Sequence, residues 1–365
     1  MKTPALAVLA AVTAVSVIAA AVVVHGRAPS AARAGAGGGE TVFAALAGKS
    51  DAIAQIVVTR AGGAFTLAKK EDRWVLADRG DFPVRGEQVN KAAEALAGLK
   101  LMEPKTAKAS LLSRLDVDDP TTESSKATLV TLKNAQGAEI GRVILGKARP
   151  DSLENPRAGV YARRPSEARA WLAEGDPKIA PATAEWVERA IVALKAEQVR
   201  RIATTAADGA KLEIARQKPE DKDFKIENLP ADHKVKNQAS VNELANTLDA
   251  LLLDDVRAAG AVEFPANAEK AELTRFDGLA VRLILAKVKD DTWVKIAVAA
   301  EPWSKTEDGK TTAVEPTAEA KKEAAELAAR LEGFAFKLTE SAAKKLQTRM
   351  AELAESVQDP AARAQ

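Results

Sequence analysis

The sequence contains no cysteine, which excludes disulfides, thiolate metal sites, iron–sulfur clusters and cysteine nucleophiles. Its two histidines, His25 and His233, leave almost nothing for a histidine-based metal site. Neither charge is in clear excess, because 53 Lys and Arg residues stand against 51 Asp and Glu residues, a net charge of +2. Nucleic-acid-binding proteins usually carry a clear basic excess, so we expect no nucleic-acid partner.

Aromatic residues are also scarce, at 4% of the chain, whereas hydrophobic residues make up 47% and charged residues 28%. This is a globular composition, which excludes a disordered tail, a collagen and a disulfide-rich mini-protein. At about 100–200 residues per domain, a chain of 365 residues is expected to form about two domains.

The N-terminal part of the chain holds a long uncharged stretch, residues 4–24. A membrane-spanning helix needs about 20 apolar residues, whereas the core of a signal peptide needs only about 7–15. The length therefore favours an uncleaved membrane anchor, although its many alanines make it a weak one. A cleaved signal segment remains the alternative, because Ala32-Arg33-Ala34 resembles a signal-peptidase site.

The positive charges around this stretch do not decide its orientation, since Lys2 precedes it and Arg27 and Arg33 follow it. A large C-terminal domain can cross a membrane regardless of such charges. We therefore expect a single span in the bacterial inner membrane, with the bulk of the chain in the periplasm. The run AGAGGG at residues 34–39 predicts a flexible tether after the anchor.

The rest of the chain contains an internal repeat, in which three short apolar strands precede a helix. The expected strands are 55–58, 65–67 and 74–76 in the first copy, and 199–202, 212–214 and 224–226 in the second. The first helix carries apolar residues from Val89 to Leu99, and the second from Val241 to Leu251. Ser240 and Glu243 match a capping box, which predicts the start of the second helix.

Antiparallel strands are expected after each of these helices, joined by turn signals at 134–137 and at 277–278. Further apolar periodicity predicts a helix at 183–197, and a C-terminal helix, strand and helix from Pro316 onward.

The predicted fold class is α+β, with an N-terminal transmembrane helix, two tandem copies of an antiparallel sheet plus a helix, and a C-terminal helical segment. The expected division is an anchor or signal segment at 1–34, a tether and start of the folded part at 35–50, the first repeat at 51–180, the second repeat with its leading helix at 181–315, and the C-terminal helix, strand, helix and tail at 316–365.

Several short motifs follow one another in a characteristic order. Trp74-Val75-Leu76 and Phe82-Pro83-Val84 precede the first helix, Leu115–Pro120 reads LDVDDP, and one strand ends in Leu145-Gly146. These motifs, and the segment 330–338, resemble a bacterial family, the domain of unknown function family 4340, over about residues 40–355. The departures are Arg114, which replaces a glycine of the family pattern, and Phe336, where tyrosine is usual.

The resemblance implies a membrane-anchored envelope protein without assigned catalysis. It also implies a gene beside an ABC-type transport system like the one associated with gliding motility. The partners it implies are the permease and auxiliary proteins of such a system, in addition to the membrane at the N-terminal helix.

No catalytic, cofactor-binding or metal-ligating residue is expected, and no cofactor. Gly48-Lys49-Ser50 lacks the first glycine of a phosphate-binding loop, which is replaced by Phe43. The acidic run from Asp116 to Asp119 lacks the calcium-loop pattern and is expected to be a solvated turn. His233 has no nucleophile or orienting group near it in sequence, so we expect no general-base role for it.

Four of the five tryptophans lie in apolar segments and are expected to fill cores. Trp303 lies in a predicted loop and is the best candidate for an exposed partner contact. We therefore expect that the protein is not an enzyme. We expect instead an extracytoplasmic accessory or scaffold protein tethered to the membrane. Two alternatives stay open, which are a module that binds a ligand in a groove between the repeats and an envelope hydrolase with an Asp/Glu site.

Overall fold

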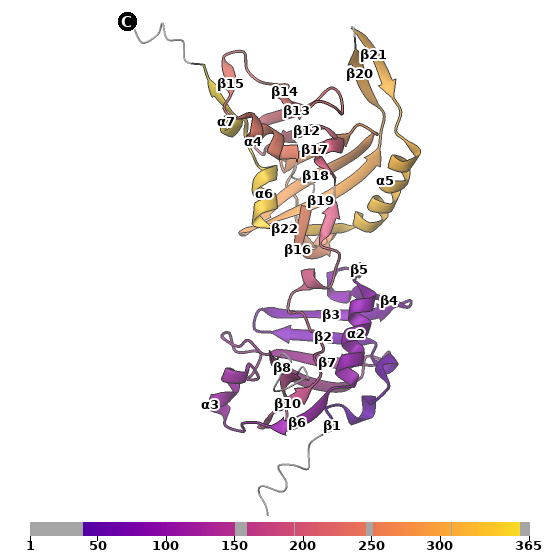
Figure 1. The fold of residues 1–365 in the computed structure, drawn as a ribbon, viewed down its shortest axis with the longest axis vertical. Helices are drawn as coiled ribbons and strands as arrows, with labels where there is room; N and C mark the ends of the chain where they lie inside the picture. Colours follow the sequence, from indigo (N-terminus) through magenta and orange to yellow (C-terminus); the bar gives the residue numbers. More distant parts are fainter. Residues whose placement is uncertain (1–38, 150–158, 193, 246–250, 308, 358–365) are drawn as a thin grey trace, which may run out of the picture. The chain divides into compact units, whose positions relative to one another are not determined.

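The computed structural model describes residues 39–149, 159–192, 194–245, 251–307 and 309–357. Contacts divide the chain into two compact units (Figure 1). Within the described ranges, unit 1 comprises the residues up to Lys69 together with Glu87–Pro181, and unit 2 comprises Lys70–Gly86 together with the residues from Ala182 onward. The segment Lys70–Gly86 thus belongs to unit 2 by its packing, although unit 1 flanks it in sequence.

Unit 1 is built on antiparallel strands that follow the order β1-β6-β10-β9-β8-β7-β2-β3. On β2, Ile56 and Val58 are buried while Val57 between them is half-buried, because successive side chains of a strand point to opposite faces. The strand bounds are β1 (Glu40–Thr41), β2 (Gln55–Arg60), β3 (Gly63–Lys70), β6 (Lys100–Pro104), β7 (Thr128–Lys133), β8 (Glu139–Arg149), β9 (Gly159–Arg163) and β10 (Ala170–Glu174).

The helices of unit 1 are few. Helix α2 (Gly86–Ala97) buries Val89 and Leu96 on one face, and α3 (Ala109–Leu112) is a single turn. Short 3-10 turns complete the unit and are η1 (Ala44–Leu46), η2 (Ser50–Ala52) and η4 (Ser113–Leu115).

Unit 2 contains a second antiparallel sheet, with the strand order β11-β16-β22-β19-β18-β17-β12-β13-β14. Two strand pairs stand apart from it, β15 with β23 and β20 with β21. The strand bounds are β11 (Ala190–Val192), β12 (Val199–Thr205), β13 (Lys211–Ala215), β14 (Lys225–Ile226), β15 (His233–Val235), β16 (Leu251–Ala258), β17 (Glu269–Arg275), β18 (Leu279–Val288), β19 (Asp291–Ala300), β20 (Trp303–Glu307), β21 (Lys310–Val314), β22 (Phe334–Leu338) and β23 (Ala354–Ser356).

The helices of unit 2 are also short, apart from α5. Their bounds are α4 (Gln238–Glu243), α5 (Ala318–Leu331), α6 (Glu340–Leu346) and α7 (Met350–Leu353). Its 3-10 turns are η3 (Ala77–Arg79), η5 (Thr183–Glu185), η6 (Ala196–Gln198) and η8 (Ala259–Ala261). Helix α5 packs mainly on β19 and also touches β18.

The two sheets share one strand order, since β11, β12 and β13 occupy the places of β1, β2 and β3, and β16 to β19 and β22 occupy the places of β6 to β10. Their registers agree as well. Ile56 lies opposite Leu67 and Leu132, and Ile202 lies opposite Ile214 and Leu273. The connections differ in one place. Residues 164–169 join β9 to β10 directly, whereas β20, β21 and α5 lie between β19 and β22.

The segment Lys70–Gly86 carries the strand pair β4 (Arg73–Leu76) and β5 (Phe82–Pro83) and packs within unit 2. The ring of Phe82 meets Phe334 and Phe336 edge to face, with centroid distances of 4.9 and 5.7 Å. Arg79 donates to Asp255 on β16 over 3.1 Å. These contacts explain why packing and sequence order assign this segment differently.

The predicted α+β class is wrong, because the described residues form mostly antiparallel β-sheet, in two large sheets, with 42% of them in strands and 23% in helices. The predicted strands at 55–58, 65–67 and 212–214 are confirmed, but the helices were overestimated. Within 183–197 the described residues form η5, β11 and the start of η6 instead of a helix, because a short apolar run suits a strand as well as a helix. The second repeat helix begins at Gln238, capped by Asn237 rather than Ser240, and Leu251 already lies in β16.

No helix in the described part of the chain is long and apolar enough to cross a membrane. The expected anchor at 4–24 and the sequence Ala32-Arg33-Ala34 lie outside the described residues.

Candidate functional site

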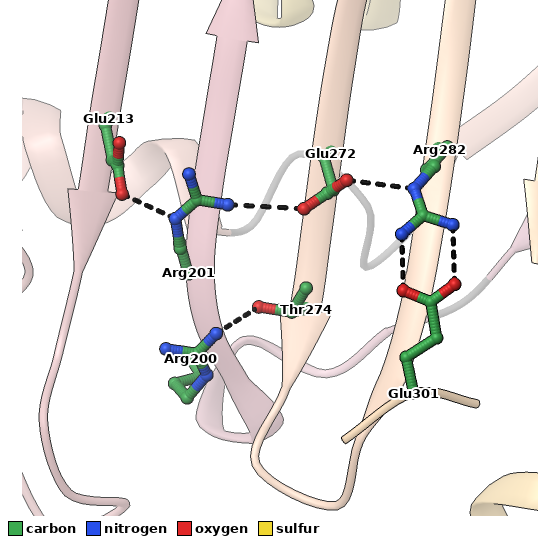
Figure 2. A network of polar contacts seen from close by, with 7 residues as sticks. All are labelled: Arg200, Arg201, Glu213, Glu272, Thr274, Arg282 and Glu301. Atoms are coloured by element: carbon green, nitrogen blue, oxygen red, sulfur yellow. Dashed lines mark hydrogen bonds and ion pairs between the residues drawn. The ribbon is translucent and has the colours of Figure 1, made fainter. Parts of the chain in front are cut away.

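A row of alternating charges crosses the sheet of unit 2 (Figure 2). We call it the charged ladder, and its members are Arg201, Glu213, Glu272, Arg282 and Glu301. Arg201 on β12 donates to Glu213 Oε1 over 2.5 Å and to Glu272 Oε1 over 3.2 Å. Arg282 on β18 donates to Glu272 Oε2 over 2.9 Å, and both of its Nη atoms donate to the carboxylate of Glu301. Glu272 on β17 therefore joins the two arginines.

Strand alternation places the ladder on one face of the sheet. Its neighbours in sequence, Ile202, Leu273 and Leu283, are buried and therefore point to the opposite face. The antiparallel register sets Glu272 directly opposite Arg282. The ladder is thus a cross-strand arrangement that the register of β12, β17 and β18 produces.

Pairing shifts the pKa values of four ladder members, Arg201, Glu213, Arg282 and Glu301, in the direction that keeps them charged. Hydrogen bonds from Arg201 lower the pKa of Glu213, and those from Arg282 lower the pKa of Glu301. The bonds to Glu301 and Glu272 raise the pKa of Arg282 above its ordinary value. Glu213, Arg282 and Glu301 are therefore held in their charged forms near neutral pH, and none of the three is poised to exchange a proton.

A second cluster lies beside the ladder, and we call it the aromatic stack. Its members are Arg200, Trp303, Phe276, Arg216 and Phe224. The Arg200 guanidinium lies 4.5 Å from the centroid of the Trp303 ring, and its Nη2 donates to Thr274 Oγ1 over 3.1 Å. Burial, with a contribution from the charge of Arg201, lowers the pKa of Arg200.

Arg216 anchors the other end of the aromatic stack. Its guanidinium lies 5.0 Å from the Phe224 centroid and 5.4 Å from the Phe276 centroid. Its Nε donates to the carbonyl of Val199 over 2.8 Å, and its Nη2 donates to the carbonyl of Ala196 over 2.9 Å. Arg216 therefore ties the start of β12 to the aromatic rings.

Trp303 is the residue that the sequence nominated for a partner contact. The structure places it at the first position of β20, half-buried between Arg200 and Phe276. Its Nε1 donates to the carbonyl of Phe276 over 2.9 Å. In this structure the indole fastens the base of the β20–β21 hairpin to the main sheet of unit 2.

The hairpin itself is exposed. Among the described strands, β20 and β21 pair only with each other. The side chains from Lys310 to Ala313 on β21 are all exposed, so neither face of this strand is covered within the described residues. Beyond the hairpin, α5 is fixed to the sheet by Arg275, which pairs with Asp277 and with Glu323 of α5 over 2.9 Å.

The remaining residues considered from the sequence take no part in the ladder or the stack. Lys49 precedes the 3-10 turn η2 and follows η1, so no strand leads into it as a phosphate-binding loop requires. His233 Nδ1 lies 2.8 Å from Asp232 Oδ1 in a polar stretch of β15. In the described part of the chain, no three His, Asp or Glu side chains gather in an arrangement that would hold a metal ion.

The acidic run from Asp116 to Asp119 forms a tight crossing over β8. Asp116 has a left-handed backbone (φ 56°), and Arg163 Nε donates to the carbonyl of Val117 over 2.7 Å. A Cβ atom at Gly146 would lie 2.7 Å from Val117 Cγ1 and 2.8 Å from the carbonyl oxygen of Asp116. Two of the motifs noted in the sequence, LDVDDP and Leu145-Gly146, therefore fit together because position 146 has no side chain.

The comparison with known families adds one finding. The family described as Domain of unknown function (DUF4340) matches residues 74–277. The chain belongs to this family. No curated protein and no solved structure matches it.

The DUF4340 match begins at Trp74, which is buried, and includes Gly146 with the crossing above it. It also includes Arg200 and Glu272, but it ends at Asp277, before Arg282 and Trp303. The part of unit 2 that carries the hairpin β20–β21 and α5 therefore lies beyond the matched DUF4340 range.

Sequence reasoning missed the charged ladder and the aromatic stack. The ladder has a readable signal, because the Asp277-Gly278 turn fixes the register that sets Glu272 opposite Arg282. The stack has none, because Arg200 and Trp303 are brought together only by the folded sheet.

Proposed function

We propose that the chain is an accessory or scaffold protein of the bacterial envelope without catalytic activity. Residues 4–24 anchor it in the inner membrane, its folded units face the periplasm, and its partner is a component of an ABC-type transport system. The observation that carries the proposal is the exposed hairpin β20–β21, which distinguishes unit 2 from unit 1.

The hairpin is suited to hold a protein partner through its edges. A two-stranded ribbon is only marginally stable in water, and a third strand stabilises it. Unpaired strand edges accept an extended segment of another chain through backbone hydrogen bonds. Trp303, held by Arg200 and by the Phe276 carbonyl, fixes the base of the ribbon and so limits the freedom that binding would have to remove.

The state of the carboxylates supports a function without catalysis. A general acid at neutral pH needs a raised pKa. Among the described residues, each carboxylate with a clear shift has a lowered pKa, including Glu213, Asp277 and Glu301. The partners of Glu213, Asp277 and Glu301 are arginines that also organise the sheet, so these three groups are engaged in the structure of unit 2.

The membrane and the transport partner come from the sequence. The uncharged stretch at 4–24 has the length of a membrane span, and the tether at 34–39 would give the folded units reach from the membrane. The transport system follows from the resemblance to the family alone.

The test is affinity purification of the full chain, tagged after residue 365, from native membranes in mild detergent, with mass spectrometry of what accompanies it. We expect a permease or ATPase of an ABC system. We expect its loss when residues 1–34 are deleted, and also when Ser304–Ala313 is replaced by a short Gly-Ser turn. The full chain recovered without such a component would overturn the transport proposal.

The matched control is the double variant Thr306→Ala and Thr311→Ala. It removes the contact between the two hydroxyls, whose oxygens lie 3.1 Å apart, but leaves both backbone edges in place. Because a strand added to the edge binds the backbone, we expect this variant to retain the partner. Retention of the partner after replacement of the hairpin would rule out the hairpin as the binding element.

A further inference from the structure

Unit 2 contains a cavity of about 140 Å³ away from the ladder and the stack. We call it the β5 cavity. Its lining includes Phe82, Arg85, Ala190, Leu253, Arg330 and Phe336. All of them belong to unit 2. Strands β5, β11, β16 and β22 and the C-terminal end of α5 contribute to its walls.

The floor of the β5 cavity is apolar and firmly packed. Ile191, Leu253 and Leu331 are each only 1% exposed. Phe82 and Phe336 meet edge to face with their centroids 5.7 Å apart, which fixes the orientation of both rings. An apolar cavity of about 150 Å³ is large enough to bind benzene. The β5 cavity therefore has room for a single aromatic or branched aliphatic group, and not for a long acyl chain.

The rim of the cavity is charged. Arg85 donates from its backbone nitrogen to the carbonyl of Trp186 over 2.8 Å and from Nη2 to the carbonyl of Glu185 over 2.5 Å. Arg330 Nη2 donates to the carbonyl of Ile191. Backbone carbonyls thus hold both guanidinium groups in place, while each retains further N–H donors.

Neither arginine has a carboxylate partner in the part of the chain that the structure describes. Across the described residues, no Asp or Glu lies within ion-pair distance of Arg85 or Arg330, although Glu188 is also at the rim. This differs from the charged ladder, where each arginine is paired with glutamates. The rim therefore carries a net positive charge above an apolar floor.

We infer that the β5 cavity binds the C-terminal residue of a protein partner when that residue has an apolar side chain. The side chain enters the cavity, and the terminal carboxylate accepts hydrogen bonds from Arg85 and Arg330. Only a chain end offers an apolar side chain and a carboxylate on the same residue, since an internal Leu or Phe carries no charge. The inference does not depend on the hairpin β20–β21 or on a transport partner.

The probes are N-acetyl-leucine and N-acetyl-phenylalanine, titrated into the full chain with labelled Ile, Leu and Val methyl groups. We expect saturable shifts of the Ile191 and Leu253 methyl signals, with a Kd of about 1 mM, as befits so small a ligand. N-acetyl-leucinamide lacks the charge, and N-acetylglycine lacks the side chain. The affinity of each should be at least about tenfold lower than that of N-acetyl-leucine.

Variants locate the two halves of the site. Arg85→Gln and Arg330→Gln should each weaken N-acetyl-leucine about tenfold, because each removes a charged donor. Ala190→Phe should abolish binding by filling the cavity. Glu188→Gln is the control at the same rim, and binding should be kept or tightened because a negative charge is removed.

Three results would each overturn the inference. They are equal binding of N-acetyl-leucine and its amide, unchanged binding in both arginine variants, and the absence of any saturable shift. Arg330 also bonds the chain at Ile191, so its variant could disturb folding. The exposed Arg85 and the amide probe keep the test decisive in that case, because neither alters the cavity floor.

Discussion

Units 1 and 2 have one strand order but use it differently. In unit 1 a short connection, 164–169, joins β9 to β10, whereas unit 2 places the β20–β21 hairpin and α5 between β19 and β22. The charged ladder, the aromatic stack and the β5 cavity also belong to unit 2. The sheet is thus a framework common to both units, and the features proposed to bind a partner belong to one copy.

Equivalent positions sharpen this contrast. By register, Gly141 corresponds to Val281, so Gly146 corresponds to Ala286. In unit 1 the chain at 115–117 crosses directly over position 146, which has no room for a Cβ atom. In unit 2 an alanine is buried at the equivalent position. The equivalent sheet position therefore has room for a Cβ atom in unit 2 but not in unit 1, where another segment of the chain crosses it.

The first prediction concerns the segment Lys70–Gly86, which lies between parts of unit 1 in sequence but packs in unit 2. Phe82→Ala should lower the free energy of unfolding by about 3–5 kcal/mol, because it empties the ring's place beside Phe334 and Phe336. Hydrogen exchange followed by mass spectrometry should show faster exchange in β16 and β22. Faster exchange confined to β7 and β8 of unit 1 would contradict the assignment of this segment.

The second prediction compares the two equivalent sheet positions. Gly146→Ala should destabilise the protein by about 3 kcal/mol, because the new methyl group meets a backbone carbonyl that cannot move aside. Ala286→Gly should cost only about 0.5–1 kcal/mol in strand flexibility, together with the small loss of a buried methyl group. Urea unfolding followed by circular dichroism measures both variants, and similar losses would show that the crossing above Gly146 does not set the difference.

Strands and turns were the part of this fold that the sequence made predictable. Alternation at Ile56 and Val58 and the Asp277-Gly278 turn are local signals, and the strands they predicted are present. The fold class was wrong because runs such as 183–197 have the apolar content of a helix, and only long-range pairing with β16 makes part of this run a strand. Local patterns also say nothing about which distant core receives Phe82.

The candidate site also combines residues that the sequence nominated with contacts that it did not predict. Trp303 was nominated from its loop context, and its contacts with Arg200 and Phe276 arise from strands that are far apart in sequence. Five elements, β5, β11, β16, β22 and α5, together form the β5 cavity, so no single stretch of sequence predicts it. Cross-strand charge pairs are the exception, because a turn fixes their register.

The third prediction uses acid to separate the units. Burial raises the pKa of Asp277, but its bonds with Arg275 and with the Leu279 N–H outweigh burial, and the pKa is lowered overall. A lowered pKa stabilises the fold above the ordinary value of about 3.9, and this contribution is lost as the pH falls through the lower folded value. Unit 2 should therefore lose stability below about pH 4.

Tryptophan fluorescence can follow this loss, since Trp171 is the one tryptophan outside unit 2. Asp277→Asn should cost about 1.5–3 kcal/mol at pH 7 and should flatten the acid dependence of the fluorescence-detected transition. Asp119→Asn in unit 1 is the control, because the pKa of Asp119 is also lowered, by bonds from Thr121. An unchanged acid profile in Asp277→Asn would contradict the assignment to Asp277.

The smallest effect concerns the charged ladder, which unit 1 does not share. By register, Arg142 corresponds to Arg282, but Thr131 stands where unit 2 has Glu272, and Arg142 pairs instead with Glu139 over 2.8 Å. Glu272→Gln should cost at most about 1 kcal/mol, because the ladder is partly exposed.

Salt provides the check on this last comparison, since the Debye length falls to about 3 Å at about 1 M ionic strength and charge pairs at the surface are then largely screened. The cost of Glu272→Gln should therefore shrink in high salt, whereas Thr131→Gln, which changes the equivalent position without removing a charge, should show a cost that salt leaves unchanged. A loss at Glu272 that is large and independent of salt would mean that this side chain acts through packing. The contribution of Glu272 would then come from its packing in the sheet and not from the charge pairs that distinguish unit 2.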